Sequence, residues 1–322
     1  MNIQETLQTA LKGRSALAGR SLLTWLDYTP DEIRSVLDLS KQVKREKNAV
    51  CERFKGKTLA LLFEKRSTRT RCAFETAFGE EGGHPVFLST ADIQLGAKES
   101  IEDTARVLGR MFSAIQFRGF KQSTVETLAN YSGVPVYNGL TDAFHPTQAL
   151  ADILTLEENF GACKGKKLCF VGDGRNNVAR SLLVISAQLG VNFSIITPKA
   201  LSPDPELLKT CEPLAQRSGA SITICDDLAG VAGADALYTD VWVSMGEESK
   251  QEERRALLKP YQINQTLMDM TSRKDAIFLH CLPAVKGEEV AADVIDGPQS
   301  RAWDQAENRK HTIKAILLAT LL

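Results

Sequence analysis

The stretch Phe63-Glu64-Lys65-Arg66-Ser67-Thr68-Arg69-Thr70-Arg71 decides the fold. It follows the apolar run from Thr58 to Leu62, which predicts a buried strand. It precedes residues 72–78, whose apolar side chains recur with the period of a helix. Ser67 and Thr68 therefore lie where a strand turns into a helix, which is the basic unit of an α/β protein.

A helix that begins at this point presents unpaired backbone N–H groups and a positive dipole end, which together attract anions. Hydroxyl groups of Ser67, Thr68 and Thr70 add neutral donors, and Arg69 adds a forked cation that suits phosphate. The simpler alternative is a capped helix with a solvated basic face, because Ser and Thr are ordinary capping residues. The rest of the chain must decide between the two.

Length and composition limit the possible classes of protein. The chain has 322 residues, which predicts two domains, and 43% hydrophobic and 25% charged residues are ordinary for a globular protein. A net charge of -1 argues against a nucleic-acid partner, which usually requires a broad basic field. We find no apolar run long enough to span a bilayer and no signal-peptide core in residues 1–19. We therefore expect a cytoplasmic protein without a membrane partner.

The cysteines and histidines predict neither disulfides nor a metal site. Seven cysteines are scattered without a C-x-x-C pair, which indicates reduced thiols in a large cytosolic chain. We expect six of them to be buried and inert, and Cys281, which lies beside His280, to be the exception. Four histidines without a pair at ligand spacing argue against a zinc site.

Strands and helices alternate along the chain. This pattern predicts an α/β fold of two doubly wound parallel-sheet domains, residues 1–150 and residues 151–322, joined by interdomain helices. The last helix, at about 305–322, is expected to pack back on the first domain. We expect strands at 56–63, 85–88, 114–117, 134–138, 168–171, 192–196, 221–225, 236–239 and 276–279. We expect helices at 30–47, 72–78, 101–111, 125–131, 149–158, 178–189, 207–218, 227–232 and 305–322.

Several groups suited to chemistry follow these strands. His145 and Gln148 lie one helical turn apart and could bind a carbonyl and an amide, although a lone His is more often structural. Residues 172–177, Gly-Asp-Gly-Arg-Asn-Asn, resemble a dinucleotide-binding turn. The turn has Asn177 where helix packing needs the third Gly, which argues against a nicotinamide cofactor. Asp240 is either the ligand of an ammonium group or the start of an Asx turn.

These signals agree in position, because nearly all lie at the carboxyl ends of predicted parallel strands. Ligands bind at that edge in open α/β sheets. Arg118 ends such a strand, and Cys281 follows another. Arg309, by contrast, lies in a predicted helix and would ordinarily be a solvated charge.

Taken together, the motifs resemble the aspartate/ornithine carbamoyltransferase family over essentially the whole chain. Ser67-Thr68-Arg69-Thr70 and His145-Pro146-Thr147-Gln148 are typical of the whole family. Asp240 with Ser244-Met245-Gly246, and His280-Cys281-Leu282-Pro283, are typical of its ornithine branch. The resemblance implies transfer of a carbamoyl group from carbamoyl phosphate to L-ornithine, giving L-citrulline and phosphate in arginine metabolism. It also implies a homotrimer that needs no metal and no organic cofactor.

The resemblance assigns roles residue by residue. It implies Arg118, His145 and Cys281 as catalytic residues. For carbamoyl phosphate it implies Ser67, Thr68, Arg69, Thr70, Gln94, Arg118, His145, Gln148, Cys281, Leu282 and Arg309. For ornithine it implies Asn177, Asp240, Ser244 and Met245. Gln94 would reach the site of a neighbouring subunit, so that each site lies at a subunit boundary.

Two alternatives stay open at the level of the sequence. A carbamoyltransferase for another amine, such as putrescine, acylated ornithine or aspartate, would share the phosphate motif. A non-catalytic relative that acts by binding would show damaged site residues, and we find none damaged. Neither the direction of the reaction nor an assembly larger than a trimer follows from the sequence.

Overall fold

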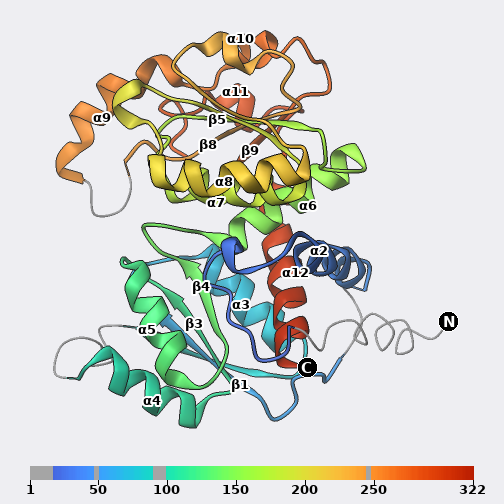
Figure 1. Cartoon of the computed structure of the whole chain (residues 1–322), viewed down its shortest axis with the longest axis vertical. Helices are drawn as coiled ribbons and strands as arrows, with labels where there is room; N and C mark the ends of the chain where they lie inside the picture. The colour runs from blue at the N-terminus through green and yellow to red at the C-terminus, as the bar shows by residue number, and fades with distance from the viewer. Residues whose placement is uncertain (1–16, 47–50, 90–98, 244–247) are drawn as a thin grey trace. The chain divides into compact units, whose positions relative to one another are not determined.

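The computed structural model in Figure 1 describes residues 17–46, 51–89, 99–243 and 248–322. The chain divides into two units, which we call the first and the second unit. The first unit consists of Met1–Leu150 together with Arg309–Leu322, and the second of Ala151–Asn308. Two helices therefore contain a boundary between the units: α6 (Pro146–Phe160) and α12 (Ala302–Leu321).

A four-stranded parallel sheet forms the centre of the first unit, with the strand order β2-β1-β3-β4. Its strands are β1 (Thr58–Phe63), β2 (His84–Ser89), β3 (Ala114–Arg118) and β4 (Val136–Leu140). Its helices are η1 (Trp25–Asp27), α2 (Pro30–Arg45), α3 (Arg69–Gly79), α4 (Ile101–Met111) and α5 (Gln122–Ser132). Helix α2 begins with a capping box, in which Thr29 and Glu32 satisfy each other's backbone N–H groups.

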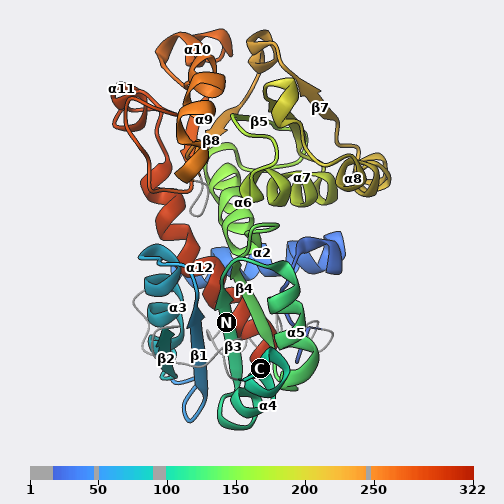
Figure 2. The same ribbon diagram turned by 90° about the vertical axis from the view of Figure 1, so that its left-hand side faces the viewer.

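Both faces of this sheet are covered, which explains why its strands read as nearly continuous apolar runs. On one face, Ala60 and Ile115 pack in a cluster with Leu108 of α4 and Val125 of α5. On the opposite face, the ring of Tyr137 meets α3 through Phe74, and its hydroxyl bonds Thr320 of α12 at 2.6 Å. Figures 1 and 2 show α4 and α5 on one side of the strands, and α3 and α12 on the other.

The second unit is built on a five-stranded parallel sheet with the order β7-β6-β5-β8-β9. Its strands are β5 (Lys167–Val171), β6 (Asn192–Ile196), β7 (Ile222–Cys225), β8 (Ala236–Thr239) and β9 (Ile277–His280). Its longer helices are α7 (Asn177–Leu189), α8 (Pro205–Ser218) and α9 (Gln251–Leu258). Shorter ones are η2 (Lys199–Leu201), η3 (Leu228–Val231), η4 (Glu248–Lys250), η5 (Lys259–Tyr261), α10 (Gln265–Met270) and α11 (Ala292–Ile295).

This second sheet is also covered on both faces. Cys169, Leu237 and Phe278 pack with Met268 of α10 and Ile295 of α11. Figure 1 shows α7 and α8 on the other side of the strands. The order of strands places β5 and β8 side by side, although the segment from α7 to η3 separates them in sequence. Topology therefore brings the turns after β5, β8 and β9 to one edge of the sheet.

The predicted α/β fold with two parallel sheets is confirmed. The predicted strands agree with the observed ones to within two residues at each end, and the predicted helix at 227–232 is the short 3-10 helix η3 rather than an α-helix. The sequence did not predict α9, α10 and α11, which contain four to eight residues each. Such short helices carry too few turns for a recognisable apolar period.

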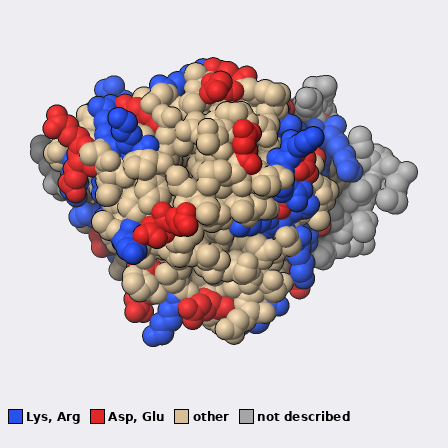
Figure 3. Space-filling model, turned by 90° about the horizontal axis from the view of Figure 1, so that it is seen from above, with Lys and Arg blue, Asp and Glu red and all other residues tan. Residues whose placement is uncertain are grey.

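Two observations concern membrane-spanning helices and the distribution of surface charge. Within the described ranges, the helices all lack the length and apolar character needed to cross a membrane. On the face shown in Figure 3, acidic and basic side chains are interspersed.

Candidate active site

The anion-site stretch of the first unit lies where the sequence predicted it, between β1 and α3. Helix α3 begins at Arg69, with Thr68 as its N-cap, and the hydroxyl of Ser67 accepts the backbone N–H of Thr70 at 3.1 Å. The Thr68 side chain makes no capping bond and is exposed. Its hydroxyl group and the N–H groups of the first turn are therefore arranged around a positive helix end.

Two buried guanidinium groups meet at the hydroxyl of Thr70. Arg118, the last residue of β3, donates its Nη1–H to Thr70 Oγ1 at 3.1 Å, and Arg309 of α12 donates from Nη2 at 3.2 Å. The backbone carbonyl of Arg118 accepts the N–H groups of Glu64 and Lys65, which fixes the end of the strand. Thr70, Arg118 and Arg309 are exposed by only 1%, 8% and 2%, so both cations lie in a medium where charge acts strongly on a ligand.

Arg309 also links the predicted motif at residues 145–148 to the one at residues 67–70. Its Nη1 donates to Gln148 Oε1 at 2.7 Å, and its Nη2 donates to Thr147 Oγ1 at 3.3 Å. The contacts of Arg309 with Thr70, Thr147 and Gln148 are thus all to neutral oxygens, which leave its positive charge uncompensated by these groups. The expectation of a solvated Arg309 from its place in a helix is wrong, because α12 packs into the first unit at this residue.

His145 lies directly before α6, buried beside these cations. Its Nδ1 is 3.5 Å from Thr147 Oγ1. Burial, followed by the charges of Arg309, Arg118 and Arg69, holds the pKa of His145 well below its usual 6.5. The imidazole is therefore neutral at pH 7 and can donate one N–H to a ligand oxygen without bringing a third buried charge.

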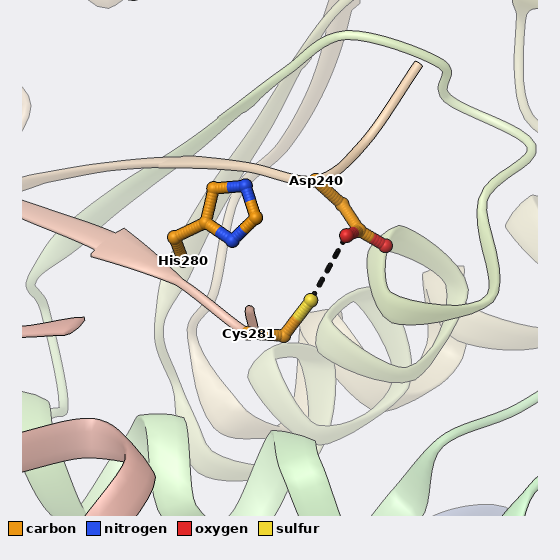
Figure 4. Close-up of side chains that lie close together, drawn as sticks. All are labelled: Asp240, His280 and Cys281. Atoms are coloured by element: carbon orange, nitrogen blue, oxygen red, sulfur yellow. Dashed lines mark hydrogen bonds between the residues drawn. The ribbon is translucent and has the colours of Figure 1, made fainter. Parts of the chain in front are cut away.

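In the second unit, the turns after β5, β8 and β9 bring three polar side chains together. The carboxylate of Asp240 accepts the thiol of Cys281 on Oδ1 at 3.0 Å and the amide of Asn176 on Oδ2 at 2.9 Å. All three are partly exposed, so a ligand can reach them. Figure 4 shows the Cys281 sulfur pointing to Asp240, with the ring of His280 beside the pair.

Asp240, His280 and Cys281 have the atom types of a metal site, and within the described part of the chain their ligand atoms lie within 4.8 Å of one another. Both ring nitrogens of His280 are already used, however. Nδ1 accepts the backbone N–H of Leu282 at 2.8 Å, and Nε2 is 3.2 Å from Glu289 Oε1. A metal ion would have to displace one of these buried contacts, so the arrangement suits a hydrogen-bonded site for an organic ligand better than a metal centre.

Comparison with known proteins places this geometry in a family. A sequence profile described as aspartate/ornithine carbamoyltransferase, carbamoyl-P binding domain, matches residues 20–158, and the Asp/Orn binding domain of the same family matches residues 164–320. An ornithine carbamoyltransferase of Caldanaerobacter subterraneus subsp. tengcongensis is 66% identical over 95% of this chain and 99% of its own length. The chain belongs to the aspartate/ornithine carbamoyltransferase family.

Two further relatives are similar to the chain over nearly its whole length. A solved structure of the ornithine carbamoyltransferase from Pyrococcus furiosus superposes with a TM-score of 0.91 at 46% identity, covering 95% of this chain and 98% of that one. A protein of Bacillus licheniformis named as a catabolic ornithine carbamoyltransferase is 51% identical over 95% of this chain and 97% of its own length.

The residues that the sequence predicted for the active site of this carbamoyltransferase form two sets, one in each unit. The set in the first unit is Ser67, Thr68, Arg69, Thr70, Arg118, His145, Gln148 and Arg309. The set in the second unit is Asn177, Asp240, Cys281 and Leu282. Gln94, Ser244 and Met245 lie outside the described residues. Asn176 was missed, because a residue that begins a helix looks like an ordinary cap in the sequence.

One expectation about the cysteines of this carbamoyltransferase is wrong. All seven are free thiols, but only Cys163, Cys169 and Cys211 are buried, whereas Cys72 is exposed on α3. Cys72 occupies a solvent-facing position of an amphipathic helix, where the apolar period does not require a buried side chain. Burial raises the pKa of Cys169 to about 11 and that of Cys211 to about 12, which makes these two thiols unreactive at neutral pH.

Proposed function

We propose that this protein transfers the carbamoyl group of carbamoyl phosphate to the δ-amine of L-ornithine, giving L-citrulline and phosphate. The observation that carries the proposal is the meeting of Arg118 and Arg309 at Thr70, with neutral His145 beside them. The family of the chain and the names of its relatives support the same reaction. The first unit, which contains this cluster, binds carbamoyl phosphate, and the second binds ornithine.

The first unit supplies donors where negative charge develops. The start of α3 with Ser67, Thr68 and Arg69 holds the phosphate group, and Gln148 binds the carbamoyl amide. Arg118 bridges the phosphate and the carbonyl oxygen, to which neutral His145 also donates. Attack on the carbonyl carbon moves an electron pair onto that oxygen, which these donors stabilise. Removal of one such donor typically lowers the rate ~10²–10³-fold.

The second unit presents the amine. Asn177, Asp240, Ser244 and Met245 bind ornithine, with Asp240 at its α-ammonium group, while Cys281 and Leu282 line the reacting end. The δ-amine attacks only when it is neutral, and a free amine of this type has a pKa of about 10.4. A site rich in cations favours the deprotonated amine. The C–N bond then forms, the C–O bond to phosphate breaks, and the departing phosphate accepts the proton from nitrogen.

Purified protein mixed with carbamoyl phosphate and, separately, L-ornithine, putrescine, N-acetyl-L-ornithine and L-aspartate tests this reaction. We expect equal amounts of citrulline and phosphate with L-ornithine, and no ureido product with the other amines. A ureido product from another amine would assign a different substrate to Asp240 and its neighbours. No product from any of the four would contradict the proposed enzyme activity altogether.

The resemblance also supports a homotrimer in which Gln94 of one subunit completes the site of the next. Two inactive variants, Gln94→Ala and Arg118→Ala, test this when they are unfolded together and refolded as mixed trimers. Random mixing gives mixed trimers in about three quarters of cases, each with one complete site of three, so we expect about a quarter of the wild-type activity to return. If Gln94 acts within its own subunit, no activity will return.

A place in arginine biosynthesis in the cytoplasm fits this reaction. Since a relative is named as catabolic, the direction must be measured. Steady-state rates of citrulline synthesis and of citrulline phosphorolysis at equal pH will show which direction the kinetics favour.

A further inference from the structure

Asn176 makes two bonds at once, and only one of them belongs to an ordinary helix cap. Its Oδ1 accepts the backbone N–H of Val178 at 2.7 Å, which caps helix α7. Its Nδ2 donates to Asp240 Oδ2 at 2.9 Å. This bond joins the turn after β5 to the turn after β8, the neighbouring strand in the sheet. A serine or an aspartate caps a helix as well as asparagine does, but neither supplies the second bond.

The direction of the Asn176 amide is fixed by chemistry. A backbone N–H can only donate, so the atom of Asn176 that faces Val178 must be the oxygen. The NH₂ group consequently faces Asp240. Helix α7 holds this group rigidly, because all its residues from Val178 to Leu189 except Arg180 are buried in the second unit.

The bonds of the Asp240 carboxylate define where a cation can approach. A carboxylate offers about four acceptor positions. On Oδ1, the backbone N–H of Val241 at 2.8 Å and the thiol of Cys281 at 3.0 Å occupy two of them. On Oδ2, Asn176 occupies a third. Among the described residues there is no further donor to this carboxylate, so one position remains, on Oδ2 beside the Asn176 amide.

We propose that Asn176 is a positioning residue, which holds the Asp240 carboxylate so that its remaining acceptor position, on Oδ2, receives the α-ammonium group of the amino-acid substrate. This inference rests on the proposed function for the identity of the substrate. Asn176 acts through Asp240 and does not itself take part in the transfer.

Three variants separate the two bonds of Asn176. Asn176→Ser keeps the cap and removes the donor to Asp240. Asn176→Asp keeps the cap and places a second carboxylate oxygen near Oδ2. Asn176→Ala removes both bonds. The matched control is Asn264→Ser, because Asn264 caps helix α10 through Leu267 and lies outside the candidate site.

For Asn176→Ser, we expect the melting temperature of the wild type, a KM for L-ornithine raised roughly tenfold, and an unchanged KM for carbamoyl phosphate. For Asn176→Asp, two carboxylates in contact cannot both ionise at low cost. The pH at which ornithine binding is lost on acidification should therefore rise. Asn176→Ala should lose both stability and ornithine affinity, whereas Asn264→Ser should change neither KM.

A calorimetric titration with L-norvaline keeps the test independent of catalysis, since this probe has the α-ammonium group but no δ-amine. We expect Asn176→Ser to weaken norvaline binding by a similar factor. Unchanged ornithine KM and norvaline affinity in Asn176→Ser would overturn the inference, as would an unshifted pH profile in Asn176→Asp. Wild-type protein that binds norvaline but makes no citrulline would contradict the proposed function and leave the role of Asn176 intact.

Discussion

Thr70 organises the two cations of the first unit, so its hydroxyl should contribute to stability even without substrate. Valine has nearly the shape of threonine, so Thr70→Val removes the oxygen without leaving a cavity. The loss affects two charge-assisted bonds, from Arg118 at 3.1 Å and from Arg309 at 3.2 Å. Such bonds contribute about 1.5–3 kcal/mol each, and Arg309 keeps its bonds to Gln148 and Thr147. We therefore expect a loss of about 3 kcal/mol in the free energy of unfolding.

The matched variant is Thr70→Ser, which keeps the hydroxyl and loses a methyl group. We expect it to cost about 1 kcal/mol, the usual effect of one buried methyl. Trp25 is buried in the first unit, so a background in which Trp242 and Trp303 are replaced by phenylalanine reports unfolding of this unit by fluorescence in urea. A cost for Thr70→Val that is equal to or smaller than that for Thr70→Ser would refute the idea that the hydroxyl holds the cations.

Two other predictions concern stability. Since the pKa of His145 is depressed in the folded state, the unfolded state binds the additional proton, and the free energy of unfolding should fall as the pH drops below about 6.5, by up to about 1.4 kcal/mol per pH unit. Urea midpoints measured from pH 7.5 to 5 should decline less in His145→Gln than in the wild type. The control His84→Gln, at an exposed position, should decline as much as the wild type. A Cβ atom on Gly109 would lie 1.8 Å from the backbone oxygen of Ser132, where α4 meets α5, so Gly109→Ala should cost ~3 kcal/mol, whereas Gly79→Ala, with open space around the added atom, should be neutral or stabilising in the same urea assay.

Much of the first set of site residues could be predicted because most of these residues lie at the end of a strand, in the loop after it or in the first turn of the next helix. β1 ends at Phe63, shortly before Ser67, and β3 ends at Arg118 itself. Parallel strands share the edge at which they end, so alternation of strands and helices was sufficient to bring these residues together. His145 was predictable on the same grounds, because it follows β4 and precedes α6.

Arg309 and Asn176 could not be found in this way, for different reasons. Arg309 lies in the middle of α12, and the period of a helix shows which residues are apolar but not what a buried polar residue meets. Asn176 satisfies a local rule, the helix cap, and its second bond depends on β5 and β8 being neighbours in the sheet. That pairing joins residues 168–170 to residues 236–238 and cannot be obtained from local spacing.

The division of the chain has a consequence for synthesis on the ribosome. The first unit needs Arg309–Leu322 in addition to its first 150 residues, and this segment includes Thr320, which bonds Tyr137. The segment of the second unit is continuous, whereas the first unit must wait for residues that are made after the second. The N-terminal half of this protein is thus not expected to be completed before the second half has been made, contrary to the usual order in which domains fold as they are translated.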